Sequence, residues 1–115
     1  MRISERLAQQ RPCFSFEFYP PKDDPALDAL FQTVGDLTRL QPGFVSVTYG
    51  AGGRSRSRTL DVVTRLKRLH EVETMAHLTC VGHSRAELVE VLDQLRDAGI
   101  QNLMALRGDP PPGEP

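Results

Sequence analysis

Residues 13–21 read CFSFEFYPP, and the alternation in this stretch decides the fold. Side chains of a β-strand alternate between the two faces of a sheet, so the three phenylalanines should share one face. Aromatic residues favour strands, and Pro20-Pro21 ends the pattern. The aromatic face needs an apolar cover, most simply a layer of helices. Glu17 falls on the opposite face, near the end of the strand.

The rest of the chain alternates strands with helices. Further strands are predicted at residues 44–49, 74–80 and 100–106. Helices are predicted from Asp24-Pro25 to Gln41, from near Thr59, and from the capping box Ser84–Glu87 to Gly99. Strands joined by single helices must run parallel, with right-handed crossovers.

Polar residues recur on one face of the first three strands, and this pattern indicates a barrel lumen. The pairs are Ser15 and Glu17, Ser46 and Thr48, and His77 and Thr79. An open sheet covered on both faces would have mostly apolar strands. We therefore predict an α/β fold, the first half of a TIM-type (β/α)8 barrel. Four parallel strands alternate with helices after a short N-terminal helix in residues 1–10. Residues 1–115 are predicted to be a single partial domain, with the remainder of the barrel absent.

Composition gives no reason to expect a nucleic-acid or membrane partner. The 115 residues are 39% hydrophobic and 25% charged, with a net charge of -1, which is typical of one soluble globular unit. Residues 1–7 have no apolar secretion core, so we expect a cytoplasmic protein. Cys13 and Cys80 lack the spacing of a disulfide framework or a metal site, and we expect buried free thiols.

The carboxyl ends of parallel barrel strands meet at one rim, where active sites form. Burial of Glu17 there would raise its pKa and suit a general acid, although a structural ion pair with a lysine or arginine is the alternative. His77 could equally be a hydrogen-bonded core residue. Residues 107–109 could be an ordinary tight turn. The same rim would hold Thr48-Tyr49-Gly50 and Thr79.

The glycine-rich segment Gly50-Ala51-Gly52-Gly53 lies where a dinucleotide-binding loop would lie. Ser55 replaces the last glycine of that fingerprint, and no acidic residue ends the next strand, so a Rossmann site is not expected. Arg54, Arg56 and Arg58 either face water or meet a cofactor phosphate near the helix N-terminus. Their spacing does not decide between these possibilities.

Four stretches together resemble the methylenetetrahydrofolate reductase family. They are residues 16–22 (FEFYPPK), 44–53 (FVSVTYGAGG), 77–80 (HLTC) and 105–109 (ALRGD). The resemblance covers nearly the whole chain from Phe14 onward. It implies an αβ barrel that binds FAD without a Rossmann fold. Such an enzyme reduces methylenetetrahydrofolate to methyltetrahydrofolate with NADH or NADPH as the electron donor.

The resemblance also implies roles for individual residues. Glu17 matches the acid that protonates the folate as its five-membered ring opens, and Thr48 matches a residue near the nicotinamide. Asp109 matches a carboxylate placed between flavin and folate, and so a catalytic and substrate-binding position. The positions that match flavin contacts are Tyr49, Ala51, His77, Arg107, Gly108 and Asp109. No metal is implied, and we expect a homo-oligomer in the full-length form.

Two other interpretations stay open on the sequence. The chain could be a non-catalytic half-barrel that self-associates or binds a partner through its open strand edges. A different flavin barrel, such as a proline dehydrogenase-like enzyme, would share the architecture. A fragment of a folate reductase is expected to be inactive alone.

Overall fold

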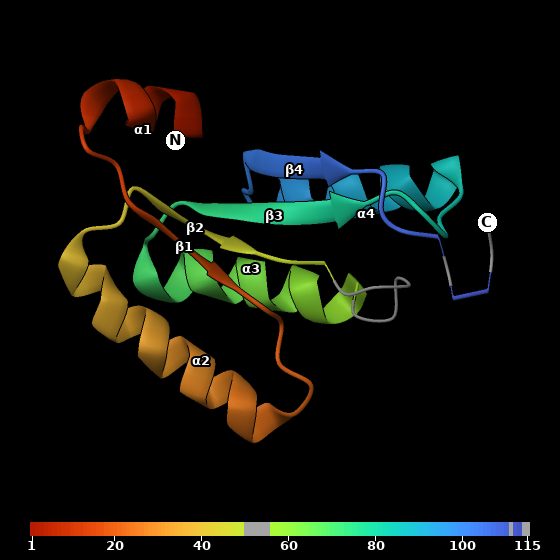
Figure 1. Ribbon diagram of the computed structural model, residues 1–115, viewed down its shortest axis with the longest axis horizontal. Coiled ribbons are helices and arrows are strands. Elements are labelled where there is room, and N and C mark those ends of the chain that lie inside the picture. The colour runs from red at the N-terminus through yellow and green to blue at the C-terminus, as the bar shows by residue number, and fades with distance from the viewer. Residues whose placement is uncertain (50–55, 111, 114–115) are drawn as a thin grey trace.

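The structure, a computed structural model, describes residues 1–49, 56–110 and 112–113. Helices and strands alternate along the chain (Figure 1). In order, the elements are α1 (Ile3–Gln9), β1 (Ser15–Phe18), α2 (Asp24–Leu37), the 3-10 helix η1 (Thr38–Leu40), β2 (Phe44–Val47), α3 (Arg56–His70), β3 (Thr74–Thr79), α4 (Arg85–Asp97) and β4 (Asn102–Leu106).

The four strands form one parallel sheet in the order β1-β2-β3-β4. All four arrows point the same way in Figure 1, so their carboxyl ends share one rim. The register places Glu17 beside Ser46 and His77 beside Met104. The predicted fold class is confirmed: parallel strands alternate with helices after a short N-terminal helix, as in part of a TIM-type barrel.

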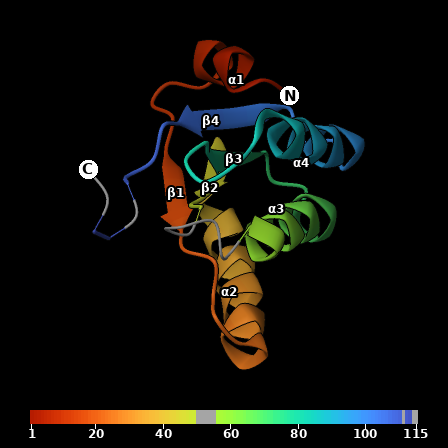
Figure 2. The same cartoon turned by 90° about the vertical axis from the view of Figure 1, so that its right-hand side faces the viewer.

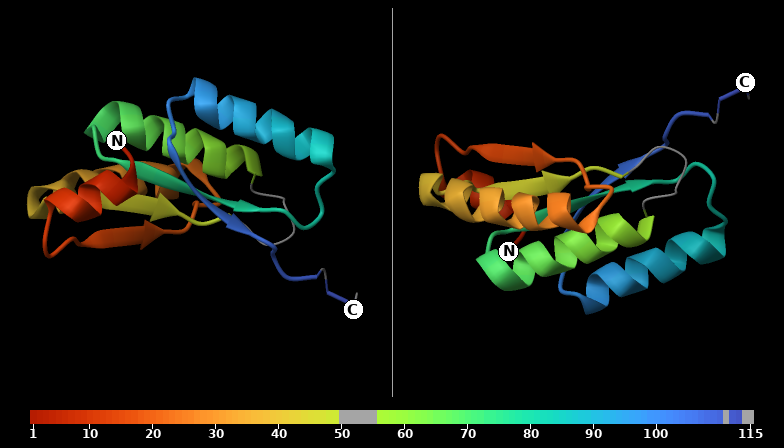
Figure 3. Two further views of the ribbon diagram at one scale, coloured as in Figure 1. Left: turned by 90° about the horizontal axis from the view of Figure 1, so that it is seen from above. Right: turned by 90° about the horizontal axis from the view of Figure 1, so that it is seen from below.

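The helices α2, α3 and α4 lie along one side of the sheet, as Figure 2 shows from the rim end. The views from above and below in Figure 3 show α3 and α4 side by side. Alternation along β2 and β3 turns valine, alanine and leucine side chains toward these helices. The buried core comprises Leu27, Phe31 and Val34 of α2, Val45 and Val47 of β2, Val62, Val63 and Leu66 of α3, Ala76 and Leu78 of β3, and Val91 and Leu95 of α4, with Val72 and Ile100 beside them.

The helix ends follow local capping chemistry, with one correction to the prediction. The N-cap of α2 is Asp23, whose side chain accepts a hydrogen bond from the Ala26 backbone N–H at 2.8 Å, so Asp24 is already helical. The capping box of Ser84 and Glu87 at α4 is confirmed. Gly99 follows that helix with φ of +79°, the conformation that glycine adopts without strain.

The two outer strands are partly exposed, and the predicted burial of Phe14 is wrong. Strand β1 begins only at Ser15, and Phe14 before it is exposed, whereas Phe16 and Phe18 pack against the core. Strand β4 exposes Leu103, Met104 and Leu106. The two cysteines are free, as expected, but each is only partly buried, so the expected full burial is wrong.

A polar network fastens the first residues of the chain to the amino end of the sheet. The buried carboxylate of Glu73 accepts hydrogen bonds from the Met1 ammonium at 2.7 Å and from Lys67 Nζ at 3.2 Å. Asn102 donates to Glu73 and to the Met1 carbonyl, both at 3.0 Å, and accepts from the Ile3 N–H at 2.8 Å. This network holds α1 beside β4, at the end opposite the rim.

Among the described helices, none combines the length and the apolar character that a bilayer crossing demands.

Candidate active site

Three polar side chains from neighbouring strands meet on the face of the sheet opposite the three helices. Glu17 Oε1 of β1 lies 3.3 Å from His77 Nε2 of β3, and Ser46 of β2 donates a hydrogen bond to the same oxygen at 3.4 Å. Each residue alternates with core residues of its own strand, which explains why all three share this face. One residue from each predicted polar pair therefore meets the others in space.

Glu17 is not buried, which corrects the prediction. Its side chain is 51% exposed, so the burial on which the raised pKa was predicted is absent. The alternative of an ion pair with a lysine or arginine is not seen either among the described residues. The neighbours of the carboxylate are instead an imidazole and a hydroxyl.

His77 is the buried member of the group, with a side chain only 8% exposed. Its Nε2 atom lies at ion-pair distance from Glu17, but the N–H direction does not make a hydrogen bond, so within the described residues this nitrogen has no hydrogen-bond partner. A buried polar atom normally has such a partner. This nitrogen is therefore available to a polar group bound against the inner face.

Thr48 and Tyr49 follow β2 directly at the rim. The Thr48 N–H donates to the Phe18 carbonyl at 2.9 Å, and its own carbonyl accepts from Thr59 Oγ1 at 3.1 Å. These two bonds fix the backbone between β1 and the first turn of α3. Burial raises the pKa of Tyr49, against the opposing charge of Arg56, so the phenol keeps its proton over the neutral range.

Residues 107–109 follow β4 at the same rim. Gly108 has φ of +87°, and a β-carbon there would overlap the side chains of Thr79 and Val81. The sequence position is therefore restricted to glycine by both conformation and space. Arg107 and Asp109 are exposed and make no ion pair with Glu17 or His77 among the described contacts.

The arginines that follow the glycine-rich segment have separate partners. Arg58 pairs with Asp24 at 3.2 Å, and Arg56 Nη1 lies 3.4 Å from His83 Nδ1. Arg54 and the predicted flavin contact Ala51 lie outside the described residues.

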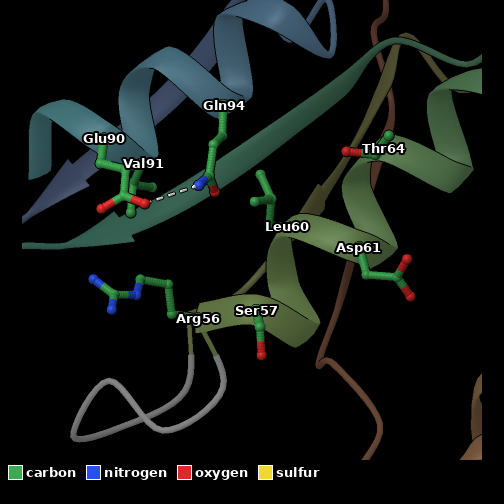
Figure 4. Close-up of a pocket in the computed structure, with 8 residues that line it drawn as sticks. All are labelled: Arg56, Ser57, Leu60, Asp61, Thr64, Glu90, Val91 and Gln94. Carbon is green, nitrogen blue, oxygen red and sulfur yellow. Dashed lines mark hydrogen bonds between the residues drawn. The ribbon is translucent and has the colours of Figure 1, made fainter. Parts of the chain in front are cut away.

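A surface groove lies outside the sheet, between α3 and α4 (Figure 4). It encloses about 470 Å³ and is lined by Arg56, Ser57, Leu60, Asp61, Thr64, Glu90, Val91 and Gln94. These residues belong to the helical layer, so the groove is separate from the group at Glu17.

His83 is the rim residue that sequence reasoning missed. Its imidazole contacts both Tyr49 and Arg56, on either side of the β2–α3 connection. The available signal was its position: it follows the end of β3 and immediately precedes the capping box of α4.

Comparison with known proteins identifies close sequence relatives. A profile of the family described as methylenetetrahydrofolate reductase matches residues 2–115. The probable methylenetetrahydrofolate reductase (NADH) of Oryza sativa subsp. japonica is 41% identical over 113 residues, which cover 98% of this chain and 19% of that protein. The 5,10-methylenetetrahydrofolate reductase of Pectobacterium carotovorum subsp. carotovorum is 40% identical over 111 residues, covering 95% of this chain and 37% of that protein. The chain thus spans only a minor part of the length of either relative.

Proposed function

Because the chain belongs to the methylenetetrahydrofolate reductase family, we propose that its protein reduces methylenetetrahydrofolate to methyltetrahydrofolate, with bound FAD and a nicotinamide donor. The observation that carries the proposal is the convergence of Glu17, Ser46 and His77 near the rim. NADH is named for the rice relative and for an Arabidopsis thaliana relative that is 40% identical, which supports NADH as the donor.

Glu17 is the proposed general acid. Opening the five-membered ring of the folate requires a proton on an amine that is otherwise a poor leaving group. The Ser46 hydroxyl holds one carboxylate oxygen, and the neighbouring imidazole restricts the position of the same oxygen. Both contacts leave the second oxygen of Glu17 available to face a substrate.

When bound, FAD supplies the hydride chemistry that connects nicotinamide and folate. His77, with its buried and unpartnered Nε2, is the described residue best suited to hold the cofactor against the inner face. Tyr49, Ala51, Arg107, Gly108 and Asp109 are the other proposed flavin contacts. Gly108 supports this role because its backbone packs directly against Thr79 and Val81, which fixes the turn that carries Arg107 and Asp109 at the rim. Thr48 is proposed to lie near the nicotinamide.

Asp109 is proposed to lie between flavin and folate. Its exposure after β4 leaves the carboxylate free to contact a ligand at the rim. A fixed negative charge there would tune the bound cofactor and orient the pterin ring by hydrogen bonding.

The proposed enzyme needs a complete barrel, with residues 1–115 as its N-terminal part. Strand β4 exposes three large apolar side chains, which is the pattern of a strand that another element covers. The bacterial relatives are about three times as long as the matched segment, enough for the remaining strands. This chain alone is therefore proposed to be inactive. The family relationship does not favour the non-catalytic alternative.

We also propose a cytoplasmic location. Two cysteines without a disulfide agree with a reducing compartment. The homo-oligomeric state stays a prediction, which light scattering of the full-length protein tests.

The experiment is the Glu17→Gln substitution in the full-length protein. Glutamine keeps the shape of the side chain but cannot donate the proton. We expect folate reduction to fall by at least about 100-fold, the scale of a lost general acid, while NADH still bleaches the flavin at close to the wild-type rate. Stopped-flow absorbance measures the two half-reactions separately.

The matched control is Glu90→Gln, an exposed residue of α4 outside the proposed site, which should leave both half-reactions unchanged. Equal loss of both half-reactions in the Glu17→Gln variant would contradict the acid role. A full-length protein that purifies colourless and takes up no FAD would overturn the proposed function.

A further inference from the structure

His83 lies between two side chains that belong to different elements of the rim. Its Nε2 is 3.0 Å from the Tyr49 hydroxyl, and its Nδ1 is 3.4 Å from Arg56 Nη1. The Tyr49 and His83 rings meet edge to face, with centroids 5.9 Å apart and planes at 82°. The His83 side chain is itself buried, which makes these contacts a fixed feature of the loop before α4.

The partners of the imidazole determine its tautomer. A guanidinium has only N–H donors, so the Nδ1 atom that faces Arg56 must accept and cannot hold a hydrogen. In the neutral ring the hydrogen then lies on Nε2, and this N–H donates to the Tyr49 oxygen. An imidazolium would instead direct an Nδ1–H donor at the donors of Arg56.

Glu87 does not supply an alternative acceptor for Nδ1. Its nearest oxygen is 4.0 Å from that nitrogen, beyond hydrogen-bond distance. The same oxygen accepts the Ser84 backbone N–H at 2.7 Å in the capping box of α4. The carboxylate is therefore committed to the helix end, and Arg56 is the partner that sets the state of His83.

This arrangement decides what the Tyr49 hydroxyl can do. Its oxygen accepts the hydrogen bond from His83, so its own hydrogen is free to be donated. Within the described residues, Tyr49 has no other side-chain hydrogen bond. Tyr49 is also only partly buried, at the rim where the proposed cofactor binds.

We propose that His83 is a positioning residue for flavin binding: as a neutral imidazole with its hydrogen on Nε2, held by Arg56, it orients Tyr49 as a hydrogen-bond donor to an acceptor atom of the cofactor. The inference rests on the proposed function, in which Tyr49 contacts FAD. It adds a residue, and a required tautomer, that the resemblance to the family did not supply.

The first test reads the tautomer directly in the full-length protein labelled with 15N-histidine. The spectrum is recorded at about pH 8, above the ordinary imidazole range. The signal that disappears in the His83→Gln variant is assigned to His83, and we expect hydrogen on Nε2 and a bare Nδ1. Hydrogen on Nδ1, or on both nitrogens, overturns the inference and leaves the proposed enzyme untouched.

The second test measures FAD affinity by fluorescence titration. The His83→Leu variant should bind FAD about tenfold more weakly, the scale of one well-placed hydrogen bond. Glutamine can accept from Arg56 through its oxygen and donate to Tyr49 through its nitrogen, so His83→Gln should recover affinity to within about threefold of wild type. His70→Gln, remote from the rim at the end of α3, is the control and should leave the affinity unchanged.

A double-mutant cycle separates positioning from general destabilisation. Tyr49→Phe should weaken FAD binding as much as His83→Leu does, and the double variant should be no weaker than either. If the leucine variant does not fold, the cycle uses His83→Gln and Arg56→Gln instead. The loss of FAD affinity in that double variant should not exceed the loss in Tyr49→Phe. Unchanged affinity in the folded His83→Leu variant, or additive losses, overturns the inference. A wild-type protein that binds no FAD overturns the proposed function and the cofactor role of His83 together, whatever the tautomer.

Discussion

The Glu73→Gln substitution tests the polar network that fastens the start of the chain to the sheet. The Glu73 carboxylate takes one hydrogen bond from the Met1 ammonium and one from Lys67, and each charge-assisted bond contributes about 1.5–3 kcal/mol. The two cations are 35% and 27% exposed, so water replaces part of what the variant loses. Glutamine also keeps an acceptor for Asn102. We therefore expect the free energy of unfolding to fall by about 2–3 kcal/mol, a factor of about 30 to 150 in the equilibrium constant.

Urea unfolding followed by circular dichroism measures the loss, and a double-mutant cycle identifies its origin. A Gly-Ser extension before Met1 removes the terminal ammonium from the network. It should cost about 1 kcal/mol in the wild-type protein and almost nothing in the Glu73→Gln variant. Asp28→Asn, an exposed position of α2, is the control for the loss of a carboxylate. An extension that costs the same in both backgrounds would refute the proposed ion pair.

The difference in the free energy of unfolding between wild type and Glu73→Gln should depend on pH with a definite sign. Burial alone would raise the pKa of Glu73, but the hydrogen bonds and charges of the Met1 ammonium and Lys67 outweigh it and hold the pKa below its ordinary value. A carboxyl group whose pKa is depressed by folding stabilises the protein above the unfolded-state value, about 4.3, and loses that contribution as the pH falls through the folded-state value. The difference in the free energy of unfolding between wild type and the variant should therefore be largest near pH 7 and shrink below about pH 4. A gap that widens in acid would contradict this reasoning.

Two further predictions concern backbone and core. Gly108→Ala should lower the free energy of unfolding by about 3 kcal/mol, because both its φ and the packed side chains oppose a β-carbon. The control Gly82→Ala, with φ of +76° and open space, should lower it by only about 1–2 kcal/mol. Similar losses in chemical denaturation would contradict the overlap at Gly108. Leu66→Ala should lower the free energy of unfolding by about 2–5 kcal/mol, since the side chain is fully buried. Leu69, in the same helix, is 60% exposed, so Leu69→Ala should lower it far less. Equal shifts in the urea midpoint would show that the core is assigned wrongly.

Local sequence signals predicted most of the fold because the residues that decide it act over short distances. The capping box at Ser84 and the glycine at position 99 fix the ends of α4 by contacts within a few residues. The start of α2 was wrong by one position because two adjacent aspartates can each cap a helix, and the backbone conformation at Asp23 decides between them.

The candidate site was only partly predictable. Strand alternation placed Glu17, Ser46 and His77 on one face, and the structure brings them together. Alternation could not predict the exposure of Glu17, because the burial of a residue on the inner face depends on which segment packs against that face. His83 had no periodic pattern to mark it. Only the folded loop shows that its two ring nitrogens meet Tyr49, just after β2, and Arg56 of α3.

The Glu17–His77 contact joins the first strand to the third, and two α-helices, a 3-10 helix and one strand lie between them in the chain. Loop-closure entropy must be overcome before such a distant pair can meet, so we expect the contact to form late in folding. A spectroscopic label at either residue would thus time the docking of β3 during refolding, and chemistry at this end of the sheet can start only after that event.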